Sequence, residues 1–180
     1  MKLINAIAFY IIWFGCIAYG DNFLPYVVLL LALHFYFIEQ PKTELYLVFV
    51  IALAGIFIDS LLTSFNVLNF EFFKSESQFR LPFLNLPLWL MALWFAFAAT
   101  VNHSLAFLKQ YFWLRIFTGL IAIPLSYFAG YQLDAVQFSF SVLITLCVLS
   151  FTWVVFMALV FPYLITATSN SVHQPINKVE

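Results

Sequence analysis

The sequence predicts an all-α integral membrane protein, a bundle of about six transmembrane helices. The first observation is composition: of 180 residues, 65% are hydrophobic and only 8% are charged, whereas soluble domains carry about 25% charged residues. The second observation is a mean hydropathy of +1.02. The third is that apolar residues form long continuous runs, unlike the alternating pattern of a membrane β-barrel.

Six runs are candidates for spans, because a spanning helix needs about 20 mostly apolar residues. They cover residues 3–20, 23–38, 45–64, 86–108, 112–131 and 138–165. We expect one transmembrane domain over 1–165, with an outer loop at 65–85 and a polar cytoplasmic tail at 166–180. The first run follows a single lysine and is long for a signal peptide, so we expect it to remain as a span.

The orientation follows from the Lys and Arg residues, because positively charged loops resist translocation. Six spans place both termini on one side. With the N-terminus inside, two of the seven basic residues lie outside, Lys74 and Arg80, and five are cytoplasmic: Lys2, Lys42, Lys109, Arg115 and Lys178. The sequence therefore predicts a multi-pass protein with both termini in the cytoplasm.

The expected partners are membrane lipids, a second copy of the chain or another membrane protein. A net charge of −1 provides no basic surface for nucleic acid. The outer loop interleaves charged residues with phenylalanines. It fits either an amphipathic helix on the membrane surface or an irregular loop packed on the bundle.

Small residues recur at helical spacing in three of the predicted spans, where they allow close approach of helices in lipid. These stripes are Ala52, Gly55, Asp59 and Thr63; Ala92, Ala96, Thr100 and Ser104; and Gly119, Ala122, Ser126 and Ala129. They predict a packed centre made of the third, fourth and fifth spans. Pro124 should kink the fifth span and free a carbonyl for Ser126, Tyr127 or a neighbouring helix.

Asp59 is the acidic residue that lies well inside a predicted span, which makes it a candidate functional group. Its depth matches that of Ser126 and Tyr127, and we expect it to face them. The carboxylate is either a substrate-binding or proton-accepting group, or a structural acceptor for hydroxyls.

A second polar group is expected near the cytoplasmic ends of the spans. It contains the candidate binding residues His34, Asn102, His103 and Arg115, with Asn5 and Ser104 at similar depth. Either the histidines are interfacial and satisfied by backbone or water, or they form a two-histidine metal or proton site. The first reading is preferred, so no metal and no cofactor are predicted.

Several enzyme classes do not fit this sequence. It has three histidines, too few for a membrane di-iron enzyme. It contains no His-Glu-x-x-His, Cys-x-x-Cys, glycine-rich phosphate loop or Gly-x-Ser-x-Gly motif.

Five stretches resemble a family of small inner-membrane proteins of unknown function from Gram-negative bacteria. The most specific elements are Pro-Leu-Trp-Leu at 87–90, Asn-His-Ser-Leu at 102–105 and Pro-Leu-Ser-Tyr at 124–127. Ile123 and Asp134 stand where the family pattern has glycines. The resemblance implies a bacterial inner-membrane location and, through an association of the family with lipid-modifying genes, a lipid-related accessory role.

Two classes of function remain. The preferred class is a non-enzymatic accessory protein or small carrier. The alternative is a membrane-embedded enzyme that acts on a lipid, with Asp59 or His103 as acid or base.

Overall fold

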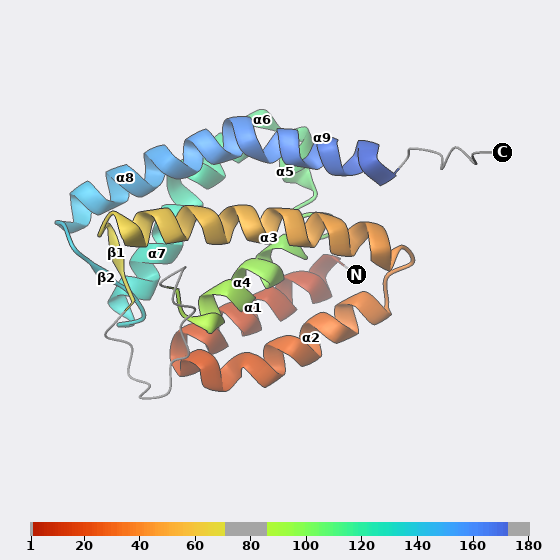
Figure 1. The fold of residues 1–180 in the computed structure, drawn as a ribbon, viewed down its shortest axis with the longest axis horizontal. Helices are drawn as coiled ribbons and strands as arrows, with labels where there is room; N and C mark the ends of the chain where they lie inside the picture. The colour runs from red at the N-terminus through yellow and green to blue at the C-terminus, as the bar shows by residue number, and fades with distance from the viewer. Residues whose placement is uncertain (1, 71–85, 173–180) are drawn as a thin grey trace.

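The computed structural model describes residues 2–70 and 86–172 as a bundle of helices that run between two ends (Figure 1). α1 (Lys2–Tyr19) and α2 (Leu24–Tyr36) form a hairpin through the short turn η1 (Gly20–Phe23). Gly20 takes a positive φ of 56° there, which glycine adopts without a steric penalty. α3 (Pro41–Ser64) then returns along the bundle, with proline in its first turn, where a missing N–H costs nothing.

A small β-ladder joins two connections at the far end. β1 (Leu68–Asn69) follows α3 and pairs antiparallel with β2 (Gln137–Phe138), which lies between α7 and α8. The outer loop predicted at 65–85 is described only as far as residue 70, so its two alternative structures lie mostly outside the described residues.

α4 (Leu88–Ala98) is shorter than the predicted fourth span. From Ala99 to Ala106 the chain continues as tight turns, with bonds such as Thr100 N–H to the Phe97 carbonyl. The Thr100 hydroxyl donates to the same carbonyl at 2.5 Å, and this competition with the helical ladder accounts for the early end of α4. Short α5 (Phe107–Gln110) follows.

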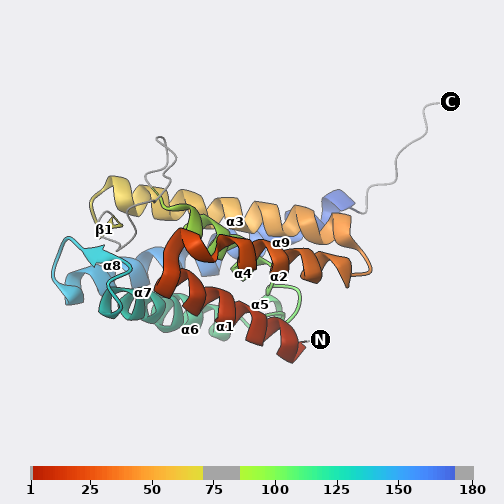
Figure 2. The same cartoon turned by 90° about the horizontal axis from the view of Figure 1, so that it is seen from below.

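Two long helical rods complete the bundle. The first consists of α6 (Phe112–Phe117), the π-helical turn η2 (Thr118–Ala122) and α7 (Ile123–Gln132). The second consists of α8 (Val142–Val155), the π-helical turn η3 (Phe156–Val160) and α9 (Phe161–Val172), so the chain stays helical into the predicted tail. α9 ends near the N-terminus, at what we call the terminal end of the bundle (Figures 1 and 2).

Four helical runs among the described residues are long and apolar enough to cross a membrane: Lys2–Tyr36, Pro41–Ser64, Phe112–Gln132 and Val142–Thr166. The first of these is the folded hairpin of α1 and α2. The structure thus supports a helical, membrane-type protein, while the number of six spans is not confirmed.

α3 is the central helix of the bundle. In its most apolar stretch of 18 residues, 50% of the residues are buried, whereas the corresponding share is 22% to 28% in the other three membrane-length runs. α4 packs along it, and the Trp94 ring lies over Gly55 so closely that a Cβ there would come within 2.3 Å of the indole. The expected centre is therefore right for the third and fourth spans, but the rod α6–α7 lies at the periphery against α8.

Pro124 frees a carbonyl of its helix for a neighbouring helix, as expected. Proline cannot donate to the carbonyl of Leu120, and Ser150 of α8 donates to that carbonyl instead at 2.8 Å. The π-helical turn η2 ends at Ala122, two residues before the proline, as is common where the regular ladder is interrupted.

Candidate functional site

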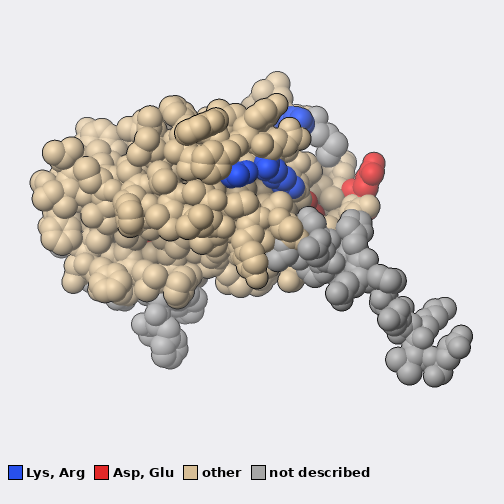
Figure 3. Space-filling model, turned by 90° about the horizontal axis from the view of Figure 1, so that it is seen from above, with Lys and Arg blue, Asp and Glu red and all other residues tan. Residues whose placement is uncertain are grey.

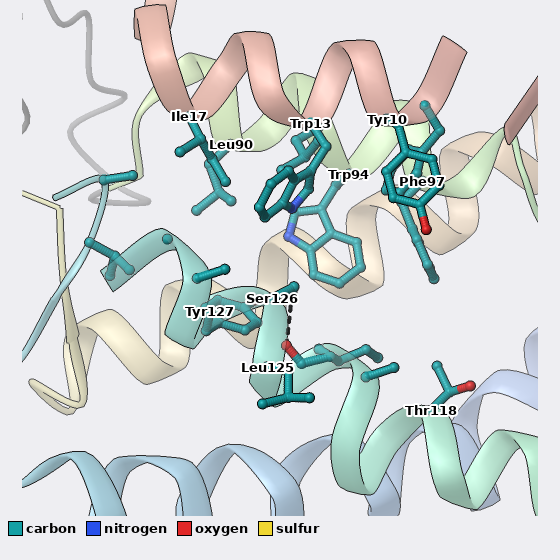
Figure 4. Close-up of a pocket in the computed structure, with 18 of the residues that line it drawn as sticks. Tyr10, Trp13, Ile17, Leu90, Trp94, Phe97, Thr118, Leu125, Ser126 and Tyr127 are labelled. Atoms are coloured by element: carbon teal, nitrogen blue, oxygen red, sulfur yellow. Dashed lines mark hydrogen bonds between the residues drawn. The ribbon is translucent and has the colours of Figure 1, made fainter. Parts of the chain in front are cut away.

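An apolar cavity of about 680 Å³ opens between α1, α4 and the rod α6–α7. Figure 4 shows Trp13 and Trp94 on one side of it and Leu125, Ser126 and Tyr127 on the other. The rod contributes small residues to this wall, among them Ser126 and Ala129. These leave space that larger side chains would fill.

The cavity has a buried floor and an exposed rim. Trp94 at the floor is 7% exposed, whereas Tyr10 and Leu125 at the rim are 70% and 53% exposed. Because the rim belongs to the sides of apolar helices, the opening faces outward from the bundle between α1 and the rod. Its size lies within the range of about 300–1,000 Å³ that is typical of ligand pockets.

Asp59 lies directly behind the cavity wall and is completely buried. Its carboxylate accepts one hydrogen bond from Trp94 Nε1 at 2.6 Å and another from the Tyr127 hydroxyl at 2.5 Å, on different oxygens. A buried polar group is costly unless it is paired, and here both oxygens are engaged. Asp59 thereby ties α4 and α7 to the central helix.

The structure separates the predicted partners of Asp59. Tyr127 lies beside it, as expected, but Ser126 donates to the Ile123 carbonyl of its own helix at 2.7 Å (Figure 4). Sequence reasoning missed Trp94. The signal for it was an indole N–H in an apolar run, since a buried tryptophan N–H usually needs an acceptor.

A polar cluster lies at the terminal end, formed by His34 of α2, Glu44 of α3 and His103 from the turns after α4. His103 Nε2 is 3.1 Å and His34 Nε2 is 3.7 Å from the same oxygen, Glu44 Oε1. The two imidazole rings meet edge to face with centroids 5.0 Å apart. We expected the histidine side chains to be satisfied by backbone or water. This expectation is wrong for His103, whose side chain bonds the buried Glu44 carboxylate.

Amides and a lysine surround this cluster. The Asn102 amide nitrogen donates to Glu44 Oε2, and Lys109 donates to the Asn102 amide oxygen. Burial lowers the pKa of the Lys109 ammonium below its ordinary value, and the neighbouring Glu44 carboxylate opposes that shift.

Asn5 connects α1 to the same cluster. Its amide nitrogen lies 3.5 Å from His34 Nδ1 and donates to the Ala99 carbonyl, while its oxygen accepts from the Ser104 hydroxyl at 2.7 Å. Arg115 lies to one side and donates to the carbonyls of Leu108 and Lys109.

Sequence reasoning grouped most of this cluster correctly but missed Glu44 and Lys109. Glu44 lies three residues inside the helix that begins at Pro41, where an acidic residue usually serves the helix dipole. The sequence did contain one indication that Glu44 could face the bundle. An uninterrupted apolar run follows it, so the first turn of this helix also packs against other helices.

A second groove of about 460 Å³ lies between α1, α2 and α4, and the polar cluster closes one end of it. Its wall is mostly aliphatic, and its polar lining includes Asn5, His34 and His103. Asp59 and Glu44 lie fifteen residues apart on α3, or about 22 Å at 1.5 Å per residue. The two polar centres are therefore separate sites.

No curated protein and no solved structure matches this chain. Residues 2–159 match the family described as "Protein of unknown function (DUF2878)". Since this match spans most of the chain, the protein belongs to the DUF2878 family.

Proposed function

We propose that this protein is a multi-pass bacterial inner-membrane protein that holds a lipid acyl chain in the cavity between α1, α4 and the rod α6–α7. It acts without catalysis, as an accessory protein or small carrier. The observation that carries the proposal is the apolar cavity itself, with its buried floor and a rim that faces outward. In a bilayer, an open apolar space next to acyl chains is filled by them.

The arrangement of charges supports the orientation with both termini in the cytoplasm. The described part of the chain has four Lys and Arg residues, at the start of α1 (Lys2), at the start of α3 (Lys42), in α5 (Lys109) and in α6 (Arg115). Figure 3 shows that on one face the basic side chains gather near the terminal end, while most of the visible surface is uncharged. We keep six spans in the proposal, with α4 and the turns that follow it counted as the fourth.

The geometry at Asp59 favours binding over catalysis. Both carboxylate oxygens are already occupied by fixed donors, and the side chain has no contact with solvent. A general acid or base must reach its substrate, whereas Asp59 is separated from the cavity by Trp94 and Tyr127. The alternative of a lipid-modifying enzyme then rests on His103, which borders the second groove.

The proposal is tested by filling the cavity. Ala129 lines it and is half-buried, so Ala129→Trp places a large ring in the acyl-chain position. Ala32→Trp is the matched control, because Ala32 is exposed on α2 and lines neither cavity. Native mass spectrometry of protein released from membranes should show retained phospholipid for the native chain and for Ala32→Trp, and several-fold less for Ala129→Trp.

Equal lipid retention in all three proteins would contradict the proposed site. The lipid profile of a deletion strain distinguishes the two function classes. A missing modified acyl species that Ala129→Trp restores but His103→Gln does not would favour the enzyme.

A further inference from the structure

We propose that His34, Glu44 and His103 form a binding site for a divalent transition-metal ion of the zinc type. The three residues come from α2, α3 and the turns after α4, and one ligand atom from each lies within 4.8 Å of the others. This inference is independent of the acyl-chain cavity, which lies elsewhere along the bundle.

The separations of the ligand atoms fit a small ion. Zinc bonds to nitrogen and oxygen are about 2.0–2.1 Å long, so neighbouring ligands of a tetrahedral ion lie about 3.3 Å apart. The distances to Glu44 Oε1 are 3.1 Å from His103 Nε2 and 3.7 Å from His34 Nε2. Small side-chain movements bring all three atoms to bonding distance of one ion.

The environment of the His34 side chain indicates that a metal ion binds here. Its Nε2 is shielded from solvent and has no hydrogen-bond partner among the described residues. A buried polar atom without a partner costs free energy, and this one faces the carboxylate. A metal ion between them would use the unpaired nitrogen and neutralise the charge of Glu44, which is 5% exposed.

Asn102 is placed to orient the Glu44 ligand. Asn102 donates to Glu44 Oε2 and leaves Oε1 to the ion. Lys109 bonds the far side of the Asn102 amide, so the ammonium is separated from the carboxylate by that side chain. The Asn5 amide nitrogen lies 3.5 Å from His34 Nδ1; metal on Nε2 leaves Nδ1 protonated, so this contact opens when the ion binds, while the bonds of Asn5 to Ala99 and Ser104 remain.

Three protein ligands leave one position open, as in zinc sites that bind a water or a substrate. The groove between α1 and α2 reaches the cluster, since Asn5, His34 and His103 line it. The fourth position therefore points to an oxygen-bearing group, such as water or the polar head of an amphiphile seated in the groove. Two imidazoles and one carboxylate favour zinc or cobalt over magnesium or calcium.

The test is a cobalt titration of the full chain in detergent after metal removal. We expect one cobalt ion per chain, a visible spectrum typical of four coordination, and its loss when zinc is added. His34→Gln is the first variant, because it removes the nitrogen that makes no hydrogen bond and should leave folding intact. Glu44→Gln is the second.

Each variant should weaken metal binding at least tenfold, since even outer contacts of metal ligands contribute about 10- to 100-fold. Glu39→Gln is the control, because Glu39 is an exposed acid in the connection between α2 and α3 and its loss should not change the titration. Thermal melting without metal shows which variants are folded. Substoichiometric binding by the native chain, or native affinity in folded His34→Gln, would overturn the assignment.

Discussion

At the residue scale, Asp59 accepts hydrogen bonds from Trp94 of α4 and Tyr127 of α7 and so joins three helices, and we propose that this structural role is the main one. Asp59→Asn keeps an oxygen for the Trp94 N–H, and the Tyr127 hydroxyl can rotate to accept from the new amide. We expect a loss of stability of about 0.5–1.5 kcal/mol, the range for one altered hydrogen bond. Asp59→Ala leaves two buried donors unpaired and should cost about 1–3 kcal/mol for each.

The measurement is unfolding of both variants in the same detergent, with complementation of a deletion strain and protein abundance followed alongside. Full complementation by Asp59→Asn is expected. If this variant were as stable as the native protein but inactive in cells, ionisation of Asp59 would be required and the structural role would be wrong.

The sequence indicated the site residues whose type is rare at their position in a membrane span. It did not indicate those whose type is common there. An acid within an apolar run and two histidines near span ends were visible, as was the matching depth of Tyr127. Glu44 and Lys109 follow the common pattern of charges at helix ends, and Trp94 is one of five tryptophans. Only the packing of α3, α4 and α5 against one another shows that these three turn inward.

At the element scale, close contact between the rod α6–α7 and α8 depends on Gly119. A Cβ on Gly119 would lie 2.6 Å from the Trp153 carbonyl oxygen, which is backbone and cannot move away cheaply. Gly119→Ala should therefore destabilise the bundle by about 1–3 kcal/mol, the usual cost of overpacking.

Gly130 provides the matched control for this prediction. It lies in the same rod, and a Cβ there would be 3.4 Å from Val136 Cγ1, an ordinary contact with a side chain. Gly130→Ala should change the melting temperature little. Equal melting temperatures for both variants would contradict the close contact at Gly119.

The bond from Ser150 to the Leu120 carbonyl replaces the bond that Pro124 cannot make. Ser150→Ala should cost about 0.6 kcal/mol, the average for hydrogen bonds between membrane helices. In a Pro124→Ala background the restored N–H can serve the carbonyl itself, so the effect of Ser150→Ala should shrink. A double-mutant cycle of detergent unfolding measures this coupling, and strict additivity would argue against it.

The apolar runs predicted the positions of the helices more accurately than the irregularities within them. The proline indicated a kink, and the structure adds the π-helical turn η2 and its partner Ser150. The short length of α4 was not predictable from hydropathy, because Val101, Leu105 and Ala106 continue the apolar pattern. Hydrogen bonding by Thr100 and the polar residues that follow ends the helix.

At the scale of the whole molecule, the start of α1 and the end of α9 lie at the same end of the bundle, the terminal end (Figure 1). In the proposed orientation, a reporter fused after Glu180 should report cytoplasm and one inserted near Lys74 should report periplasm, because positively charged loops resist translocation. α9 continues to Val172, so a fusion after the last residue avoids interrupting it. The account has three spans between the two positions, so reporters that place both on the same side would show an even number of spans and contradict it.

The central claim is that an acyl chain occupies the cavity between α1, α4 and the rod α6–α7. The most direct measurement is photolabelling in vesicles with a phospholipid that carries a photoactivatable group near the end of one acyl chain, followed by mapping of the adducts. The account predicts adducts concentrated on floor residues such as Trp94 and Leu90, which are 7% and 5% exposed, and their loss in Ala129→Trp. Adducts confined to exposed residues, spread evenly over the outside of the bundle and unchanged in Ala129→Trp, would contradict it.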